Sequence, residues 1–197
     1  MNDGLEIILD YLKENAFITT KTADSLGVKK HKMAKYAKEG HIIRTYRGKY
    51  VLNKDDADMY EVFQAKSEKM IYSYMTAFYL HGLTPNEPKK IHVSLPQGYN
   101  ASRIKKREDT HIHYVKKIWH DFGKETILSP KNKPVTVYDK ERCICDMIRD
   151  KNSMDPEVFK EAIHVYFKSG EADIERLNKY AEYMKIADRV RIYTEIF

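Results

Sequence analysis

Residues 29–40 read Lys-Lys-His-Lys-Met-Ala-Lys-Tyr-Ala-Lys-Glu-Gly, in which cationic and apolar side chains alternate until a glycine. Successive residues of an α-helix are rotated by about 100°, so Met33, Tyr36 and Ala37 would share one face. The opposite face gathers the cationic side chains His31, Lys35 and Lys38, with Lys32 at its flank. The stretch therefore predicts a short helix with one packed side and one row of cations.

Two further helices are predicted before this one. Apolar residues recur at helical spacing, at Leu5, Ile8, Leu9 and Leu12. This spacing predicts a helix that starts near Asn2 or Asp3. A second, short helix follows Thr19-Thr20, either of which can cap it, and ends at Gly27, a residue suited to a left-handed stop.

A β-hairpin is predicted after the cationic helix. Gly40 ends that helix, and residues 41–52 form two short β-rich runs about a turn that contains Gly48. Three helices followed by a hairpin predict a winged helix-turn-helix domain over residues 1–54.

The positive charge of the chain is concentrated in the same segment. The protein has 197 residues and a net charge of +6, from 35 Lys and Arg against 29 Asp and Glu. Residues 28–54 hold nine bases and one acid, whereas residues 1–27 carry −3 and residues 55–197 carry +1. Such a local excess is typical of a surface that meets a polyanion. The alternative is a solvated helix face without a binding role.

Lys29 and Lys30 are placed where a helix tolerates cations least. A cation at a helix N-terminus opposes the helix dipole, at a cost of about 0.3–1 kcal/mol. A phosphate would offset that cost, because it pairs with the ammonium groups and with the free N–H groups of the first turn. The hairpin tip, Arg47-Gly48-Lys49, can reach phosphates or the minor groove beside a helix in the major groove. We therefore expect this domain to bind double-stranded DNA.

Several motifs resemble a known family. They are Phe17-Ile18-Thr19-Thr20 through Leu26-Gly27-Val28, Met33-x-x-Tyr36-Ala37-Lys38-Glu39-Gly40, and Arg47-Gly48-Lys49-Tyr50-Val51-Leu52. Together they resemble the N-terminal winged helix of AbiE-type antitoxins, the repressor halves of bacterial type IV toxin–antitoxin, or abortive-infection, systems. The similarity continues through residues 91–98 and 135–146, so it covers most of the chain.

The resemblance implies a cytoplasmic repressor that binds inverted repeats in its own promoter and so autoregulates a toxin–antitoxin operon. It implies that the C-terminal domain antagonises a nucleotidyltransferase toxin without a stable complex. It also implies a chain that is monomeric in solution and cooperative on promoter DNA.

The resemblance also implies a set of DNA-contacting residues. Carried over by position, they are Thr20, Lys29, Lys30, His31, Lys32, Lys35, Lys38, Arg44, Arg47 and Lys49. Many relatives have Ser or Thr and Arg where this chain has Lys29-Lys30-His31. Lysine reads guanine less well than arginine, which weakens the prediction of base-specific contacts.

Residues 55–197 are expected to form a second domain, after a linker at residues 53–58 where the charge changes from basic to acidic. Strands are predicted at residues 90–95, 110–118, 125–128 and 134–138. Helices are predicted at residues 73–80, 139–150 and 172–187, with another that starts at Asp155-Pro156. Strands enclosed by helices indicate an α+β domain.

A second cationic segment lies in this domain, at Arg103, Lys105, Lys106 and Arg107, with Lys116 and Lys117 nearby in sequence. It is either an ordinary exposed loop or a second nucleic-acid contact. On the same side as the hairpin it would extend the DNA footprint, and on another side it would serve the antitoxic activity.

Metal and catalytic sites find little support in the sequence. His111 and His113 share one face of a predicted strand and His92 could join them, but no carboxylate or cysteine lies at ligand spacing, which favours surface histidines. Glu87-Pro88-Lys89 matches half of a nuclease signature, yet no Asp lies between Asp58 and Asp109 to complete it. We therefore expect a binding protein without catalytic residues, cofactor or metal.

Two other functions remain as alternatives. One is a metal-dependent nuclease, or another nucleic-acid-modifying enzyme, that the winged helix directs to its target. The other is an interaction module whose Tyr- and Met-rich C-terminal domain docks a protein partner.

The composition also suggests the compartment. The acidic start of the chain is unlike a signal peptide, and no apolar run approaches the roughly 18 residues that a transmembrane helix needs. Two cysteines, at positions 143 and 145, exclude a cysteine-ligated metal cage and fit a reducing cytosol. We therefore expect a cytoplasmic protein without a membrane partner.

Overall fold

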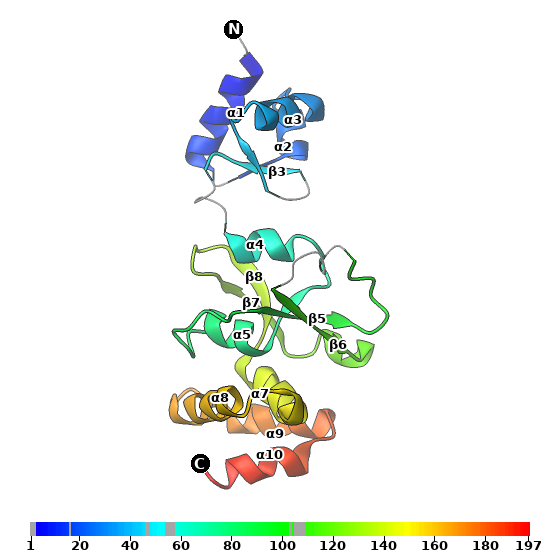
Figure 1. The fold of residues 1–197 in the computed structure, drawn as a ribbon, viewed down its shortest axis with the longest axis vertical. Coiled ribbons are helices and arrows are strands. Elements are labelled where there is room, and N and C mark those ends of the chain that lie inside the picture. Colours follow the sequence, from blue (N-terminus) through cyan, green and yellow to red (C-terminus); the bar gives the residue numbers. More distant parts are fainter. Residues whose placement is uncertain (1–2, 16, 46–47, 54–57, 103, 105–108) are drawn as a thin grey trace. The chain divides into compact units, whose positions relative to one another are not determined.

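A computed structural model describes residues 3–15, 17–45, 48–53, 58–102, 104 and 109–197 (Figure 1). The chain is of the α+β class, as the sequence predicted, and has two sheets. It divides into two compact units, Met1–Glu68 with Ser129–Lys133, and Lys69–Leu128 with Pro134–Phe197. The linker expected at residues 53–58 falls mostly at 54–57, outside the described residues.

The N-terminal unit combines four helices with a three-stranded sheet. Its elements are α1 (Asp3–Glu14), β1 (Ile18–Thr19), α2 (Thr20–Ser25), α3 (Lys30–Lys38), β2 (Ile43–Arg44), β3 (Lys49–Val51) and α4 (Met59–Gln64). The strand order is β1-β3-β2 and both pairings are antiparallel, with Ile18 opposite Tyr50 and Ile43 opposite Val51. The three predicted helices and the predicted hairpin strands are therefore present.

Local sequence explains where these elements begin and end. The Thr19 hydroxyl caps α2 by accepting the Thr22 N–H at 3.0 Å, and Gly27 ends the turn after α2 with φ +81°. Gly48 has φ +74°, and a Cβ there would lie 2.8 Å from Thr20 Oγ1. Only glycine fits this close approach between the hairpin and α2.

One apolar cluster holds the N-terminal unit together. Its buried members come from α1, α2, α3, strands β1 and β3, and the segments before α3 and β2: Ile8, Leu12, Ile18, Ala23, Val28, Met33, Tyr36, Ile42 and Tyr50. Helix α1 lies so close to α3 that a Cβ at Gly4 would be 3.0 Å from the Tyr36 hydroxyl oxygen. The apolar residues whose helical spacing was recognised in the sequence, Leu5, Ile8, Leu9 and Leu12, therefore pack in this common core.

Within this unit, one buried carboxylate joins helix α4 to the segment Ser129–Lys133. Asp58 caps α4 by accepting the Glu61 N–H at 2.8 Å, and its other oxygen accepts the Ser129 hydroxyl at 2.6 Å. Asp58 and Ser129 are 2% and 4% exposed. Because a buried carboxylate is costly without such partners, this pairing fixes the segment to α4.

The C-terminal unit is built on a five-stranded sheet. Its strands are β4 (Ile71–Tyr72), β5 (Ile91–Pro96), β6 (Thr110–Val115), β7 (Lys124–Leu128) and β8 (Pro134–Tyr138), in the order β6-β5-β4-β8-β7. The β5–β6 and β4–β8 pairs are parallel, and the others are antiparallel.

Helices follow and separate these strands. They are α5 (Tyr74–Leu80), α6 (Lys117–His120), α7 (Lys140–Arg149), α8 (Pro156–Lys168), α9 (Ile174–Tyr183) and α10 (Ala187–Thr194), with a short 3-10 turn, η2 (Lys151–Ser153). Helices α5 and α6 pack against β5. Helix α7 packs against α5, α8, α9 and α10, and these C-terminal helices gather about it in Figure 1. It is therefore the central helix of the unit.

Two predicted elements end differently in the structure. The strand predicted at residues 110–118 ends at Val115, because α6 begins two residues later. The helix predicted at residues 172–187 is α9 and ends at Tyr183, before Lys185 with its left-handed φ of +58°, and a separate helix that the sequence did not predict, α10, begins at Ala187. Among the described residues, no helix combines the length and apolar character that crossing a bilayer requires.

A buried arginine ties α7 to the loops of this unit. Arg142 is 0% exposed and donates to Asp146 Oδ2 at 3.0 Å. Its Nη1 also donates to the main-chain oxygens of Trp119 and Phe122, at 2.6 and 2.8 Å. The guanidinium lies 4.3 Å from the Tyr138 ring centroid. One cation thus links the turn before β7, strand β8 and α7.

Replacing Arg142 with Met should destabilise the C-terminal unit by about 3–5 kcal/mol, since the buried Asp146 carboxylate would lose this partner. Urea denaturation followed by the fluorescence of Trp119, the single tryptophan, measures this change. Arg191→Met is the control, because the Arg191 side chain is 64% exposed and should matter by less than about 0.5 kcal/mol. Equal stability of the two variants would contradict the structural role of Arg142.

Candidate nucleic-acid interface

Helix α3 presents its cations to solvent. Met33 and Tyr36 are 0% and 1% exposed, so they fix which side of the helix faces the core. The side chains on the remaining faces are exposed: Lys30, His31, Lys32, Ala34, Lys35 and Lys38. The predicted division into a packed side and a cationic side is therefore confirmed.

The N-terminus of α3 has no side-chain cap that accepts its first backbone N–H groups. Lys29 is its N-cap residue and makes no side-chain hydrogen bond to the helix. The Lys29 ammonium instead pairs with Asp24 at 2.9 Å, where both side chains are more than half exposed. Asp24, Lys29, Lys30, His31 and Ala34 line a shallow hollow beside this end. Two lysines and one histidine therefore line the hollow, together with the Asp24 acid that pairs with Lys29.

Few acids neutralise the exposed face. Glu39 approaches Lys35 at 3.8 Å and the His41 imidazole at 3.9 Å. Within the described part of the chain, Lys30, Lys32 and Lys38 form no ion pair. Exposed pairs such as Lys35–Glu39 contribute little, so the face keeps its positive potential.

Of the hairpin cations, the structure places Arg44 and Lys49. Arg44 on β2 is exposed, whereas Arg47 lies outside the described residues. Lys49 is not a free hairpin cation: its ammonium lies 2.9 Å from Glu61 Oε1 and 3.8 Å from the Phe17 ring centroid. Thr20 is half-buried and its N–H donates to the Gly48 carbonyl at 2.8 Å. Thr20 and Lys49 therefore support the turn.

The second cationic segment cannot be placed in the same way. Arg103, Lys105, Lys106 and Arg107 lie outside the described residues. Lys116 and Lys117 are exposed, and the Lys116 ammonium lies 4.7 Å from the Trp119 ring centroid. The role of this segment stays a hypothesis.

Three histidines come together on the sheet of the C-terminal unit, where the sequence favoured ordinary surface residues. His92 and His113 are half-buried and His111 is exposed. Burial, followed by the neighbouring imidazoles, lowers the pKa of His92 and of His113, so both rings are neutral at pH 7. The alternation at positions 111 and 113 was visible in the sequence, but the pairing with His92 depends on strand register.

The residues considered for catalysis are not assembled into a site. Glu87 is exposed and belongs to no group of three metal-binding side chains among the described residues. Cys143 and Cys145 are buried on α7, and burial raises the pKa of both thiols well above the usual range. A reactive thiolate needs the opposite shift, so neither cysteine suits nucleophilic chemistry.

Lys49→Met should destabilise the N-terminal unit by about 1–3 kcal/mol, because the Glu61 side chain, only 15% exposed, loses its charged partner. Hydrogen exchange at the amides of β3 and α4 measures the change. Lys32→Met is the matched control on an exposed site and should leave exchange unaltered. If Lys49→Met exchanges like the wild type, the pair does not support the hairpin.

Comparisons with known proteins do not assign this chain to a family. No protein-family model matches this chain, and no curated protein is significantly similar to it. The family resemblance of the sequence motifs therefore stays a prediction.

Proposed function

We propose that the N-terminal unit is a winged helix that binds double-stranded DNA through α3, and that the chain is an AbiE-type antitoxin that represses its own operon. The observation that carries the DNA-binding part is the exposed cationic face of α3, held outward by the burial of Met33 and Tyr36. The antitoxin part rests on the sequence resemblance.

The order of the elements supports a winged helix. Helices α1, α2 and α3 are followed by the β2–β3 hairpin, and β1 pairs with β3 to complete a small antiparallel sheet. In such a domain the helix after the turn is the one that enters the major groove. Here that helix is α3, which carries the densest positive charge.

The size of α3 also suits the groove. A helix with its side chains is about 10–12 Å across, and the major groove is about 12 Å wide, so a short helix such as α3 can lie within it. Its N-terminal end, with Lys29 and Lys30, would meet a backbone phosphate. His31, Lys32 and Lys35 would then face base edges or flanking phosphates.

Phosphate contacts should dominate the affinity. The exposed face offers ammonium groups and an imidazole but no arginine on α3, and lysine pairs with guanine as a single charge rather than as a fork. Specific recognition of inverted repeats would then depend on two copies of the chain binding side by side. This matches the cooperative repressor that the resemblance implies.

The contribution of α3 can be measured from the salt dependence of binding to the chain's own promoter DNA. Each phosphate that is neutralised adds about 0.9 to the slope of log affinity against log salt. Lys32→Ala and Lys35→Ala should each weaken binding and reduce the slope by about 1. Lys13→Ala is the control, since this exposed lysine lies on α1 and pairs with Asp10. Unchanged affinity and slope in both α3 variants would rule out this interface.

The antitoxic activity can be separated from repression in cells. Co-expression with a nucleotidyltransferase encoded beside this chain should restore growth, and the enzyme should not co-purify with it. The double variant Lys32→Ala, Lys35→Ala should lose promoter repression but still restore growth, because the proposal assigns the two activities to different units. If the wild-type chain does not restore growth, the antitoxin part is wrong while the DNA-binding part stands.

A further inference from the structure

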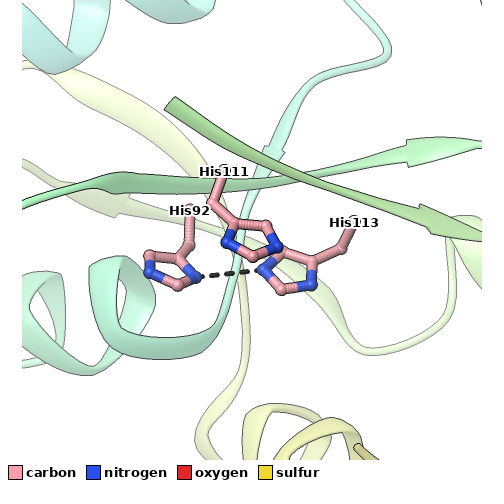
Figure 2. Close-up of side chains that lie close together, drawn as sticks. All are labelled: His92, His111 and His113. Atoms are coloured by element: carbon pink, nitrogen blue, oxygen red, sulfur yellow. Dashed lines mark hydrogen bonds between the residues drawn. The ribbon is translucent and has the colours of Figure 1, made fainter. Parts of the chain in front are cut away.

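Three histidines share one face of the β5–β6 pair in the C-terminal unit (Figure 2). The parallel register places His92 directly beside His111, and His113 follows two residues along β6. Side chains alternate between the faces of a strand, so all three imidazoles emerge on the same side. This arrangement is independent of the DNA-binding surface.

The distances between the imidazoles approach those of a coordination shell. His92 Nδ1 and His113 Nε2 share a hydrogen bond of 3.0 Å, whose proton would move to another ring nitrogen when an ion binds, and one potential ligand nitrogen from each ring lies within 4.8 Å of the others. Three nitrogens bound to tetrahedral Zn²⁺ are about 3.3 Å apart, given Zn–N bonds of about 2.0–2.1 Å. The ligand atoms therefore need to move by no more than about 1.5 Å.

The required movement is the rotation of an imidazole ring about its side-chain torsion. The His111 and His113 rings are stacked, with centroids 4.4 Å apart and planes 8° apart, so their nitrogen lone pairs lie in parallel planes. Rotation of the exposed His111 ring about χ2 would turn its nitrogen toward the other two imidazoles, and this torsion has a broad energy minimum in histidine. His111 is exposed, which leaves the site open to an ion from solvent.

The contacts of Tyr74 beside the histidines are a second observation that favours a binding site. The Tyr74 ring stacks on His113 with centroids 3.7 Å apart, and its hydroxyl donates to Asp150. Arg149 Nη2 donates to the same hydroxyl oxygen at 3.1 Å. Tyr74 has a φ of +49°, a left-handed conformation that a bulky residue rarely adopts. Strain of this kind persists where surrounding contacts hold a side chain in place for a function.

We propose that His92, His111 and His113 bind a Zn²⁺-class transition-metal ion, with its fourth coordination position open to water or to an exogenous ligand. Three imidazoles without a carboxylate suit Zn²⁺ and exclude ions that prefer oxygen ligands, such as Mg²⁺ and Ca²⁺. Tyr74 is a positioning residue, because it orients the His113 ring and makes no contact with the ion. The inference goes beyond the proposed function and does not depend on it.

Calorimetric titration of the tag-free, full-length protein with ZnCl₂ tests this proposal. The wild type should bind one ion per chain, and Co²⁺ in its place should give the visible absorption of a tetrahedral complex. His111→Gln alters an exposed side chain, so the fold should be retained. This variant and His92→Gln should each lower the affinity for Zn²⁺ at least tenfold. His164→Gln, an exposed histidine on α8, should bind like the wild type.

Two outcomes would overturn the proposal. One is the absence of Zn²⁺ binding by the wild type, and the other is equal affinity in the wild type and in His111→Gln. Tyr74→Leu distinguishes orientation from simple proximity: it should weaken binding about 10–100-fold and alter the Co²⁺ spectrum, as loss of an orienting neighbour does. An unaltered spectrum in a folded Tyr74→Leu protein would remove the positioning role, while the His111→Gln result decides the site itself.

Discussion

The burial of Met33 and Tyr36 in the N-terminal core is the constraint on which the proposed function depends. A fully buried apolar side chain of this size contributes about 1.5–3 kcal/mol, so rotation of α3 about its own axis is strongly disfavoured. Gly4 allows α1 to approach Tyr36 closely and completes the packing. Because the rotation is fixed, the cationic side chains of α3 face solvent together: Lys30, His31, Lys32, Lys35 and Lys38.

In the C-terminal unit, the register of the strands determines which side chains lie together. The parallel β5–β6 pairing places His92 beside His111, and a slip by one residue would send one of them to the other face. The sheet is held to its helices through α7, whose buried Arg142 satisfies main-chain oxygens of the turn before β7. The histidine cluster thus exists only because long-range contacts select one register.

Patterns of local origin were predictable from the sequence, and long-range ones were not. A cap at Thr19 or Thr20, the stop at Gly27 and the two faces of α3 follow from neighbouring residues, and the structure shows Thr19 as the cap and agrees with the other two. The short central strand β4 was missed, because two residues carry no periodicity. The pairing of Lys49 with Glu61, twelve residues apart, was missed for a different reason, since α4 had not been predicted. The three-histidine cluster needed the β5–β6 register in the same way.

The most direct test of the central claim is to titrate ¹⁵N-labelled protein with duplex promoter DNA and to follow the backbone amide signals. The account predicts that the largest shifts occur at residues 29–38 and at Arg44, and that they weaken as salt is added. Shifts confined to the C-terminal unit, or to α1, would contradict it.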